Sequence, residues 1–318
     1  MELSVIIPCF NAEGAIGVQL EALASQQWGN AWELIVSDNG STDRSMEIVK
    51  SYQNRLPHLR IVDSSACQRQ SYALNVGARA SAGRALVFCD ADDEVAPGWL
   101  AIMGDALLKH DIVHGRICFD KFNDPKESDW LARLWVDGLY RGQFLPHAGA
   151  ANIGVRRQIH ELIGGFDEGL PRFADGDYSW RLQLEGYQFH YEPQAVYQYR
   201  IARIKPTLAS LFRRGWTAPA ADYWTYKKYR SLGIKKEMIL PRHRKFRASW
   251  ASWFEALKTM PRALRGQKER KDWLEQFVTR TGDVYGQFKG RLENPCRPYC
   301  PKNPSYRAIL NFDFRPVR

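Results

Sequence analysis

Short apolar runs and amphipathic segments alternate along the first 120 residues of the chain. Runs rich in aliphatic and β-branched residues predict strands at 3–8, 32–39, 59–64 and 85–89. Between these runs, apolar residues recur at helical spacing and predict helices, for example over 13–26 and 70–82. Strands that alternate with helices at this spacing predict an α/β fold with a doubly wound, mostly parallel sheet.

The pattern changes in the second half of the chain. Residues 110–200 mix strand-like runs with helical segments, whereas the pattern beyond about residue 200 is helical. We therefore expect two domains, an α/β domain over residues 1–200 and a basic, aromatic-rich helical extension over residues 201–318.

Two features of the extension predict how its helices pack. One helix face carries the apolar residues Phe246, Trp250, Trp253, Phe254 and Leu257. A second helix has a glycine at every fourth position, Gly282, Gly286 and Gly290, which predicts a close approach of another helix within the protein.

The charge of the chain is unevenly distributed. Its formal net charge of +10 combines an acidic part and a basic part. Residues 1–199 carry 17 Lys and Arg against 26 Asp and Glu, whereas residues 200–318 carry 28 against 9. An acidic part followed by a strongly basic part indicates two separate tasks.

The N-terminal sequence and the cysteines favour a cytosolic protein. The N-terminus, MELSVIIPCF, has no basic stretch followed by a long apolar one, so we expect no signal peptide. The sequence has no run of 18 uninterrupted apolar residues, so we expect no transmembrane helix. The six cysteines do not form a disulfide framework, and a reducing compartment suits them best.

Three polar loops follow three of the predicted strands. In a doubly wound sheet, ligands bind beyond the carboxyl ends of the parallel strands. The loops expected at that edge are PCFNAE (8–13), SDNGSTD (37–43) and CDADDE (89–94). We therefore expect them to line one binding site.

The third loop gathers Asp90, Asp92 and Asp93 at the end of an apolar strand. Carboxylates are hard oxygen ligands that suit Mg²⁺ or Mn²⁺, and Mg²⁺ is usually held by one or two carboxylates together with substrate phosphates. A capped, solvated turn is the alternative for so short a motif. In the second loop, an aspartate at position 38 can accept a hydrogen bond from a nucleobase N–H, and an Asx turn with a helix cap is the alternative for this loop.

The stretches VIIPCFN, VSDNGSTD and FCDADDE, in this order and at these intervals, resemble the nucleotide-sugar-binding half of family 2 glycosyltransferases, which have the GT-A fold. Downstream, GAANIGVRR and IGGFDEGLPRFADGDYSWRLQLEGY resemble the acceptor-side half of the same family. The resemblance covers roughly residues 1–200.

The resemblance implies a role for each matching residue. The nucleotide-sugar-binding positions that it implies are Pro8, Phe10, Asn11, Asp38, Arg69, Asp90, Ala91 and Asp92. Asp90, Asp92 and Asp93 match the metal site, and Asp175 matches the catalytic base. The acceptor-side positions are Asn152, Asp177 and Arg181. His147 lies near this side too, but we interpret it as an ordinary loop histidine.

The chain departs from the family pattern at three positions. Ala174 stands where the family usually has Glu, and Leu74 stands where an Arg often precedes Asn75. Gln198 occupies the place of a histidine that is a candidate third metal ligand. These departures keep open the possibility of a relative that binds nucleotide without catalysis.

We therefore expect an inverting, Mn²⁺- or Mg²⁺-dependent transfer of a sugar from a nucleotide-sugar, most simply a UDP-sugar, to a glycan or lipid-linked acceptor. A nucleotidyltransferase of similar fold is the enzyme alternative, although its Gly-rich loop with a basic residue is missing after the first strand. A nucleic-acid- or lipid-binding protein is the other alternative.

The basic third leaves three interpretations open: a surface for anionic membrane at the cytoplasmic face, a structural bundle packed on the catalytic domain, or a nucleic-acid surface, the least favoured of the three. The sequence does not reveal the sugar, the acceptor or the oligomeric state.

Overall fold

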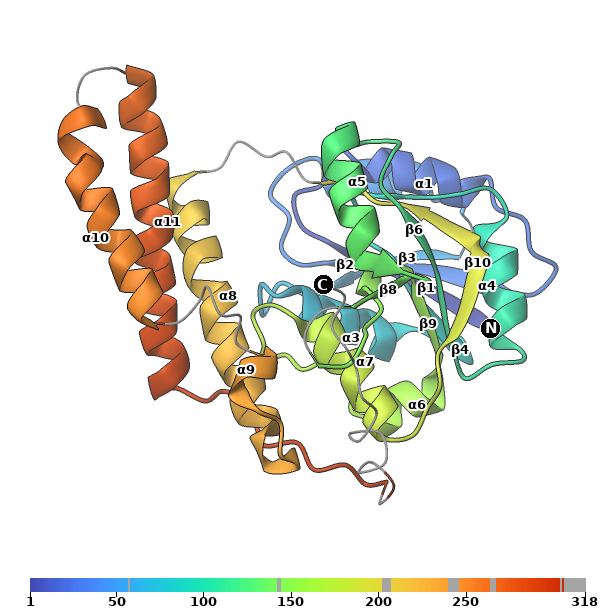
Figure 1. The fold of residues 1–318 in the computed structure, drawn as a ribbon. Helices are drawn as coiled ribbons and strands as arrows, with labels where there is room; N and C mark the ends of the chain where they lie inside the picture. The colour runs from blue at the N-terminus through green and yellow to red at the C-terminus, as the bar shows by residue number, and fades with distance from the viewer. Residues whose placement is uncertain are drawn as a thin grey trace. The chain divides into compact units, whose positions relative to one another are not determined.

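The computed structural model describes residues 1–303 and 305, apart from residue 57 and the segments 142–143, 202–206, 240–245 and 264–266 (Figure 1). The described residues form two compact units. Of the described residues, unit 1 contains those within 1–168, 175–201, 301–303 and 305, and unit 2 contains those within 169–174 and 207–300.

Unit 1 is built on an eight-stranded sheet with the strand order β3-β2-β1-β4-β9-β6-β10-β5 in the described part of the chain. Its strands are β1 (Leu3–Cys9), β2 (Trp32–Asp38), β3 (Leu59–Asp63), β4 (Ala85–Phe88), β5 (Glu94–Val95), β6 (Ile112–Cys118), β9 (Ile153–Arg156) and β10 (His190–Gln198). Strands β3, β2, β1 and β4 are parallel, and β6 and β10 run in the same direction. Only β9 and the edge strand β5 are reversed, so the prediction of a mostly parallel sheet is confirmed.

Helices cover both faces of this sheet because successive residues of a strand point to opposite sides. They are α1 (Ile16–Ala24), α2 (Ser45–Ser51), α3 (Gln70–Ala80), α4 (Trp99–Leu107), α5 (Pro125–Leu134), α6 (Arg157–Leu162) and α7 (Ala174–Leu184), with a 3₁₀ turn, η1 (Ala150–Asn152). Leu3, Val5, Ile7 and Cys9 of β1 belong to the buried layer with α1, α2 and α4, and Ile6 belongs to the layer with α3, α6 and α7 on the other face.

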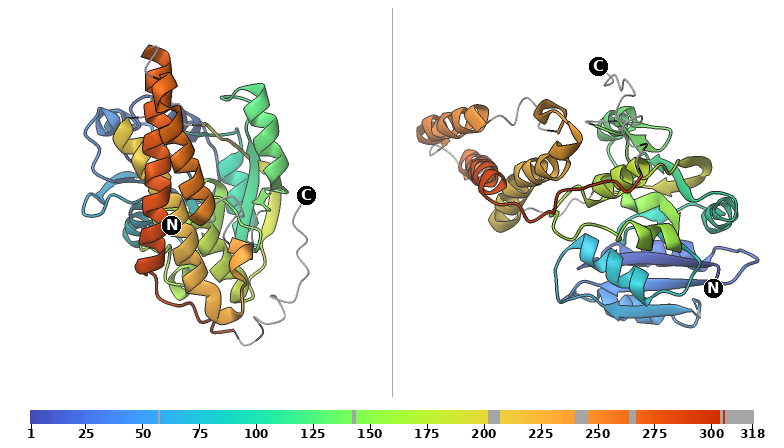
Figure 2. Two further views of the ribbon diagram at one scale, coloured as in Figure 1. Left: turned by 60° about the vertical axis from the view of Figure 1, so that its left-hand side comes forward. Right: turned by 90° about the horizontal axis from the view of Figure 1, so that it is seen from below.

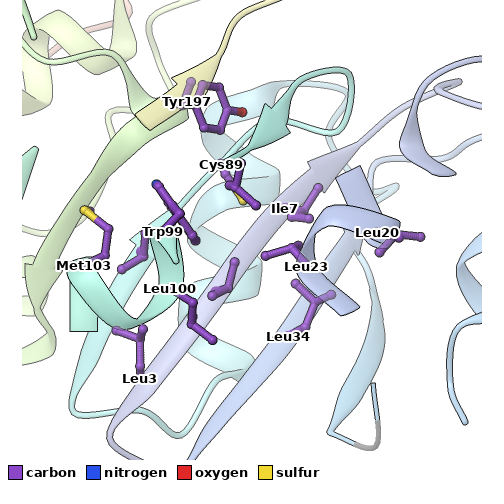
Figure 3. Close-up of a cluster of buried hydrophobic side chains, with 14 of the residues drawn as sticks. Leu3, Ile7, Leu20, Leu23, Leu34, Cys89, Trp99, Leu100, Met103 and Tyr197 are labelled. Carbon is purple, nitrogen blue, oxygen red and sulfur yellow. The ribbon is translucent and has the colours of Figure 1, made fainter. Parts of the chain in front are cut away.

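The first of these two layers is the larger hydrophobic core. Figure 3 shows side chains of this layer, among them Leu20 and Leu23 of α1, Trp99 of α4, and Leu3 and Ile7 of β1. Every one of these side chains is fully buried. Burying a large aliphatic side chain contributes roughly 1.5–3 kcal/mol, so this layer fixes the strand ends that carry the polar loops.

The pattern of apolar residues did not predict one part of unit 1. Helix α5 is followed by a two-stranded hairpin, β7 (Trp135–Val136) and β8 (Leu139–Tyr140), which pairs as a separate sheet. Each strand has only two residues, too few for an alternating pattern to register.

Unit 2 is helical. Its elements are α8 (Leu208–Tyr229), η2 (Arg230–Leu232), α9 (Lys236–Ile239), α10 (Phe246–Ala263) and α11 (Gln267–Leu292). Within this unit, α10 and α11 run side by side in each view (Figures 1 and 2). No helix in the described segments is long and apolar enough to span a bilayer.

The glycines of α11 allow α8 to pack directly on its backbone. A Cβ atom on Gly286 would lie 2.2 Å from the Trp216 carbonyl oxygen, and one on Gly282 would lie 2.5 Å from that of Phe212. Real side chains do not tolerate such distances, so the predicted close approach of a helix is confirmed.

The aromatic face of α10 is packed mainly within unit 2. The Trp253 ring lies 5.7 Å from that of Phe277, and its Nε1–H donates to Thr281 Oγ1 at 3.0 Å. Trp250 contacts Phe288 at 6.2 Å between ring centroids, whereas Phe254 is half exposed. The Phe246 side chain, which the sequence places on the same face, lies outside the described residues.

Candidate active site

The loops after β1 and β2 are joined to each other by hydrogen bonds. Asn39 N–H donates to the Cys9 carbonyl at 2.8 Å. Asn11, with a positive φ of 48°, accepts from Thr42 N–H through its Oδ1 at 2.8 Å, and its own N–H donates to Ser41 Oγ. The structure thus uses Asn11 as a brace between loops. Of the other predicted residues here, Pro8 pairs with Ser37 inside the sheet and Phe10 is 45% exposed.

Asp38 is the last residue of β2. Its Oδ1 accepts from Ser41 N–H at 2.9 Å, which closes the turn that follows the strand. Its carbonyl accepts from Ser64 N–H at 2.8 Å, beyond the end of β3. The turn uses one carboxylate oxygen of Asp38, so the side chain is held at the sheet edge with a fixed orientation.

Asp90, Asp92 and Asp93 form a tight carboxylate cluster at the end of β4. One oxygen from each of them lies within 4.8 Å of the others. Burial, together with repulsion from Asp92 and Asp175, raises the pKa of Asp90. Burial and the charges of Asp90 and Asp92 raise the pKa of Asp93, which is 1% exposed, and burial also raises the pKa of Asp92.

The cluster fits a divalent cation. Asp93 Oδ2 is buried and has no hydrogen-bond partner in the part of the chain that the structure describes. Such an oxygen costs free energy unless a positive charge or a donor compensates it. Three carboxylates that converge at this spacing supply the hard oxygen donors that Mg²⁺ or Mn²⁺ prefers. Ala91, between the first two aspartates, is buried.

Three residues that the sequence analysis missed brace this loop. Gln70 Nε2 donates to Asp90 Oδ1 at 2.7 Å, and Asp90 N–H donates to the Tyr197 hydroxyl at 2.7 Å. Gln19, fully buried in α1, donates to the Asp90 carbonyl and accepts from Val95 N–H. A polar Gln19 among the apolar positions of the first predicted helix was the one available signal.

Arg200, two residues after the end of β10, is a further residue that the sequence analysis missed. It brings a positive charge to the aspartate loop. Its backbone N–H donates to Asp93 Oδ1 at 2.6 Å, and its Nε donates to the Asp92 carbonyl at 2.8 Å. The guanidinium lies 3.7 Å from the centroid of the Phe122 ring. Arg200 therefore holds a fixed positive charge at the edge of the aspartate loop.

Asp175 lies in the first turn of α7, where its Oδ1 accepts from Gly176 N–H at 2.8 Å. Its charge raises the pKa of Asp90, so the structure brings these two carboxylates within electrostatic range although 85 residues separate them. It also interacts with His147: burial lowers the pKa of this histidine, and the Asp175 carboxylate opposes the shift. Ala174 offers no carboxylate beside it.

The remaining predicted residues bind protein groups. The Arg69 guanidinium donates to the Glu168 carbonyl. Two residues earlier in the same loop, the Phe166 carbonyl accepts from Asn75 Nδ2. Asn152 is buried, accepts from Trp99 Nε1 at 2.8 Å and donates to Ala195 O.

Asp177 and Arg181 form a buried ion pair at 2.8 Å, and Arg181 also donates to the Ile163 and Gly165 carbonyls. These contacts give Asn152, Asp177 and Arg181 a structural role, and their contact with an acceptor stays a prediction.

Gln198, at the position where the family often has histidine, ends β10 opposite Glu94 of β5. Its Oε1 is buried and has no hydrogen-bond partner within the described residues. A role of Gln198 as a metal ligand stays a prediction.

Solved structures share this fold. A mannosyltransferase from Pyrobaculum calidifontis, solved with GDP-Man and Mn²⁺, matches with a TM-score of 0.55 at 17% identity, over 90% of this chain and 87% of that one. Residues 1–349 of Staphylococcus aureus TarS, solved with UDP, match with a TM-score of 0.50 at 17% identity, over 91% and 92% of the two chains. Unit 1 therefore has the GT-A type of α/β fold, followed by a helical C-terminal region, as predicted.

The profile of the family described as Glycosyl transferase family 2 matches residues 4–163, and the chain belongs to this family. The uncharacterized glycosyltransferase YibD of Escherichia coli K12 is 39% identical over 168 residues, which cover 52% of this chain and 47% of that protein. The glycosyltransferase AglE of Haloferax volcanii is 28% identical over 212 residues, or 61% and 65% of the two chains. The chain thus spans between about half and two thirds of the length of these relatives.

Proposed function

We propose that this protein transfers a sugar from a nucleotide-sugar, a UDP-sugar in the simplest case, to a hydroxyl of a glycan or lipid-linked acceptor, with inversion at the anomeric carbon. One observation carries the proposal: the aspartate cluster at the end of β4 and Asp175 from α7 lie within electrostatic range of each other. A sugar between them would have its leaving group on one side and a base on the other.

The donor side comprises the loops after β1, β2 and β4. In our proposal, Asp38 accepts a hydrogen bond from the nucleobase, and Pro8, Phe10 and Asn11 line the first nucleotide-contacting loop. Asp90, Ala91 and Asp92 approach the ribose and diphosphate, and Arg69 lies on the same side. Support comes from the geometry, since all three loops follow neighbouring parallel strands and the loops after β1 and β2 are bonded to each other.

Asp90, Asp92 and Asp93 are the residues that would hold Mn²⁺ or Mg²⁺. A bound divalent ion supplies positive charge that stabilises the leaving diphosphate. The P. calidifontis mannosyltransferase was solved with Mn²⁺, which supports the assignment by analogy. Arg200, bonded to both Asp92 and Asp93, adds a permanent positive charge beside the leaving group in our proposal.

Asp175 is proposed as the general base that takes the proton from the acceptor hydroxyl. The hydroxyl oxygen forms the new bond to the anomeric carbon while the bond from that carbon to the nucleotide diphosphate breaks. Asp175 ends the step protonated, and the diphosphate leaves with the electron pair of the broken bond.

The basic residues 201–318 have a second role in the proposal, namely association with the acceptor or with an anionic membrane surface at the cytoplasmic face. The packing of the α10 aromatic residues on α11 supports a structural contribution as well. Co-sedimentation of the full chain with phosphatidylglycerol vesicles tests the membrane part, and binding equal to that seen with neutral vesicles contradicts it.

A thermal-shift screen tests the proposed function. The full chain is heated with UDP, GDP, TDP or CMP, each with Mn²⁺ and with EDTA. We expect one nucleotide, UDP in the simplest case, to raise the melting temperature only when Mn²⁺ is present. If none of the four nucleotides gives metal-dependent stabilisation, the proposal is wrong.

A further inference from the structure

The β7–β8 hairpin presents aromatic rings on the acceptor side of unit 1. Trp135 pairs with Tyr140 and Val136 pairs with Leu139, and the turn between them places Asp137 at φ 50° and Gly138 at φ 68°. Both turn residues have positive φ, as a tight type I′ hairpin turn requires. Trp135 and Tyr140 are partly exposed.

The hairpin is fixed at both of its ends. At the turn, a Cβ on Gly138 would lie 2.4 Å from the Gly115 carbonyl oxygen and 2.8 Å from His114 Nδ1, so the turn rests directly on β6. At the open end, Tyr140 N–H donates to the His147 carbonyl at 2.8 Å, and His147 N–H donates back to Tyr140 O at 3.1 Å. The hairpin is therefore anchored on β6 at its turn and on the segment around His147 at its open end.

The loop that follows the hairpin is bonded to the helix that carries Asp175. Trp180 Nε1 donates to the Leu145 carbonyl at 2.7 Å, and Gln183 Nε2 donates to the Pro146 carbonyl at 2.8 Å. Ala148 N–H donates to Ser179 Oγ at 3.2 Å. Three side chains of α7 thus hold residues 145–148, and the hairpin and the proposed base belong to one framework.

His147 connects the aromatic rings with Asp175. Its side chain is buried, with its ring centroid 5.0 Å from that of Tyr140 and 6.3 Å from that of Trp135. Trp135 and Tyr140 are 5.8 Å apart at 69°. The same imidazole interacts electrostatically with Asp175. His147 therefore contacts both partly exposed rings and lies within electrostatic range of Asp175.

We propose that Trp135 and Tyr140 form a subsite for a sugar ring of the acceptor, and that His147 positions this subsite relative to Asp175. The inference rests on the proposed function, because it takes Asp175 as the base. A pyranose has an apolar C–H face and a polar rim, which match an aromatic ring face and the Tyr140 hydroxyl, respectively. An acceptor whose sugar lies on these rings brings a hydroxyl to Asp175, so the subsite selects a glycan end rather than a simple alcohol.

Binding to an array of immobilised oligosaccharides that includes hexose, N-acetylhexosamine and deoxyhexose ends tests the subsite. The full chain is applied with UDP and Mn²⁺. We expect the wild type to bind a subset of the glycans, Trp135→Ala to weaken that binding about tenfold, and Trp135→Phe to keep most of it. Trp130→Ala is the matched control, since Trp130 is 63% exposed on α5 outside the hairpin.

Two results overturn the subsite: no glycan bound by the wild type, or unchanged glycan affinity of Trp135→Ala. If the alanine variant does not fold, Trp135→Leu keeps the apolar volume without the flat ring and is judged by the same criterion. The UDP and Mn²⁺ thermal shift is measured on every variant. If the wild type shows no such shift, the proposed function fails. If the wild type shows the shift and Trp135→Ala keeps wild-type glycan affinity, only the subsite is rejected.

Discussion

The proposed donor side and the proposed acceptor side of unit 1 are held in place by different kinds of contact. The loops after β1, β2 and β4 extend from neighbouring parallel strands. Hydrogen bonds join the first two loops to each other, and side chains of α1 and α3 hold the third. Asp175 instead depends on α7, on residues 145–148 and on a hairpin docked at β6. The first arrangement follows from the sheet, and the second must be assembled from distant segments.

The difference teaches where each step of the reaction should be sensitive. Substitutions at the donor edge should change the affinity for nucleotide and metal, because the proposed function assigns both ligands to the strand-end loops. Substitutions at the acceptor side should change turnover and leave nucleotide affinity nearly constant. The predictions below test this separation, beginning with the largest expected effect.

Asp175→Asn should remove the base without changing the volume of the side chain. We expect turnover to fall by about 10³-fold, within the range that general base catalysis contributes. The affinity for UDP with Mn²⁺ should stay within about twofold, as measured by titration calorimetry beside a transfer assay. Asp129→Asn, at an exposed position of α5, is the control. Wild-type turnover in Asp175→Asn would remove Asp175 from the mechanism.

Asp92→Ala should weaken the part of UDP binding that depends on Mn²⁺ and leave the metal-independent part unchanged. We expect Mn²⁺-dependent UDP affinity to fall by about 100-fold, because one of three converging oxygen donors is lost. Binding measured in EDTA should change little. Glu47→Ala is the control: it removes an exposed carboxylate from α2 of unit 1, and the variant should bind UDP as the wild type does. Equal losses with Mn²⁺ and with EDTA would contradict the metal assignment.

The buried histidine His160 should make the folded protein less stable in acid. His160 packs on Phe88, Phe166 and Tyr178, and burial lowers its pKa from 6.5 to about 4. The unfolded chain therefore binds a proton between pH 6.5 and 4 that the folded chain does not. The contribution of this group to stability is complete above pH 6.5 and is lost as the pH falls toward 4.

We expect this histidine alone to lower the free energy of unfolding by about 2 kcal/mol between pH 7 and 5. His160→Gln, which can still bond the Tyr178 hydroxyl, should lose less stability over that interval than the wild type. Urea unfolding of both proteins at the two pH values without metal measures the difference. Equal losses in the two proteins would show that His160 does not cause the acid sensitivity.

The same contrast explains what the sequence predicted well. Asp38, Asp90 and Asp92 follow apolar runs directly, so the position of each at the sheet edge follows from the strand before it. Asn11 was placed in the right loop, but its bonds to Ser41 and Thr42 depend on the neighbouring loop.

Other features were out of reach of the sequence. Gln70, Tyr197 and Arg200 reach the aspartates from helix α3 and from strand β10 and the residues after it, and no local pattern marks them. The β7–β8 hairpin gives no alternating signal, and its position depends on Gly138 meeting β6. Residues whose role depends on tertiary contacts need the structure.

Asp38→Asn gives the smallest expected change and the finest test of the donor side. One oxygen of Asp38 already accepts from Ser41 N–H, and an asparagine can keep that bond while presenting an NH₂ group in place of the second oxygen. A donor then faces the uracil N3–H, so we expect UDP affinity to fall about tenfold while the affinity for Mn²⁺ alone is unchanged. Titration of both ligands measures this. If UDP binds to Asp38→Asn as it does to the wild type, Asp38 serves only the turn, and base recognition must come from another residue of the donor edge.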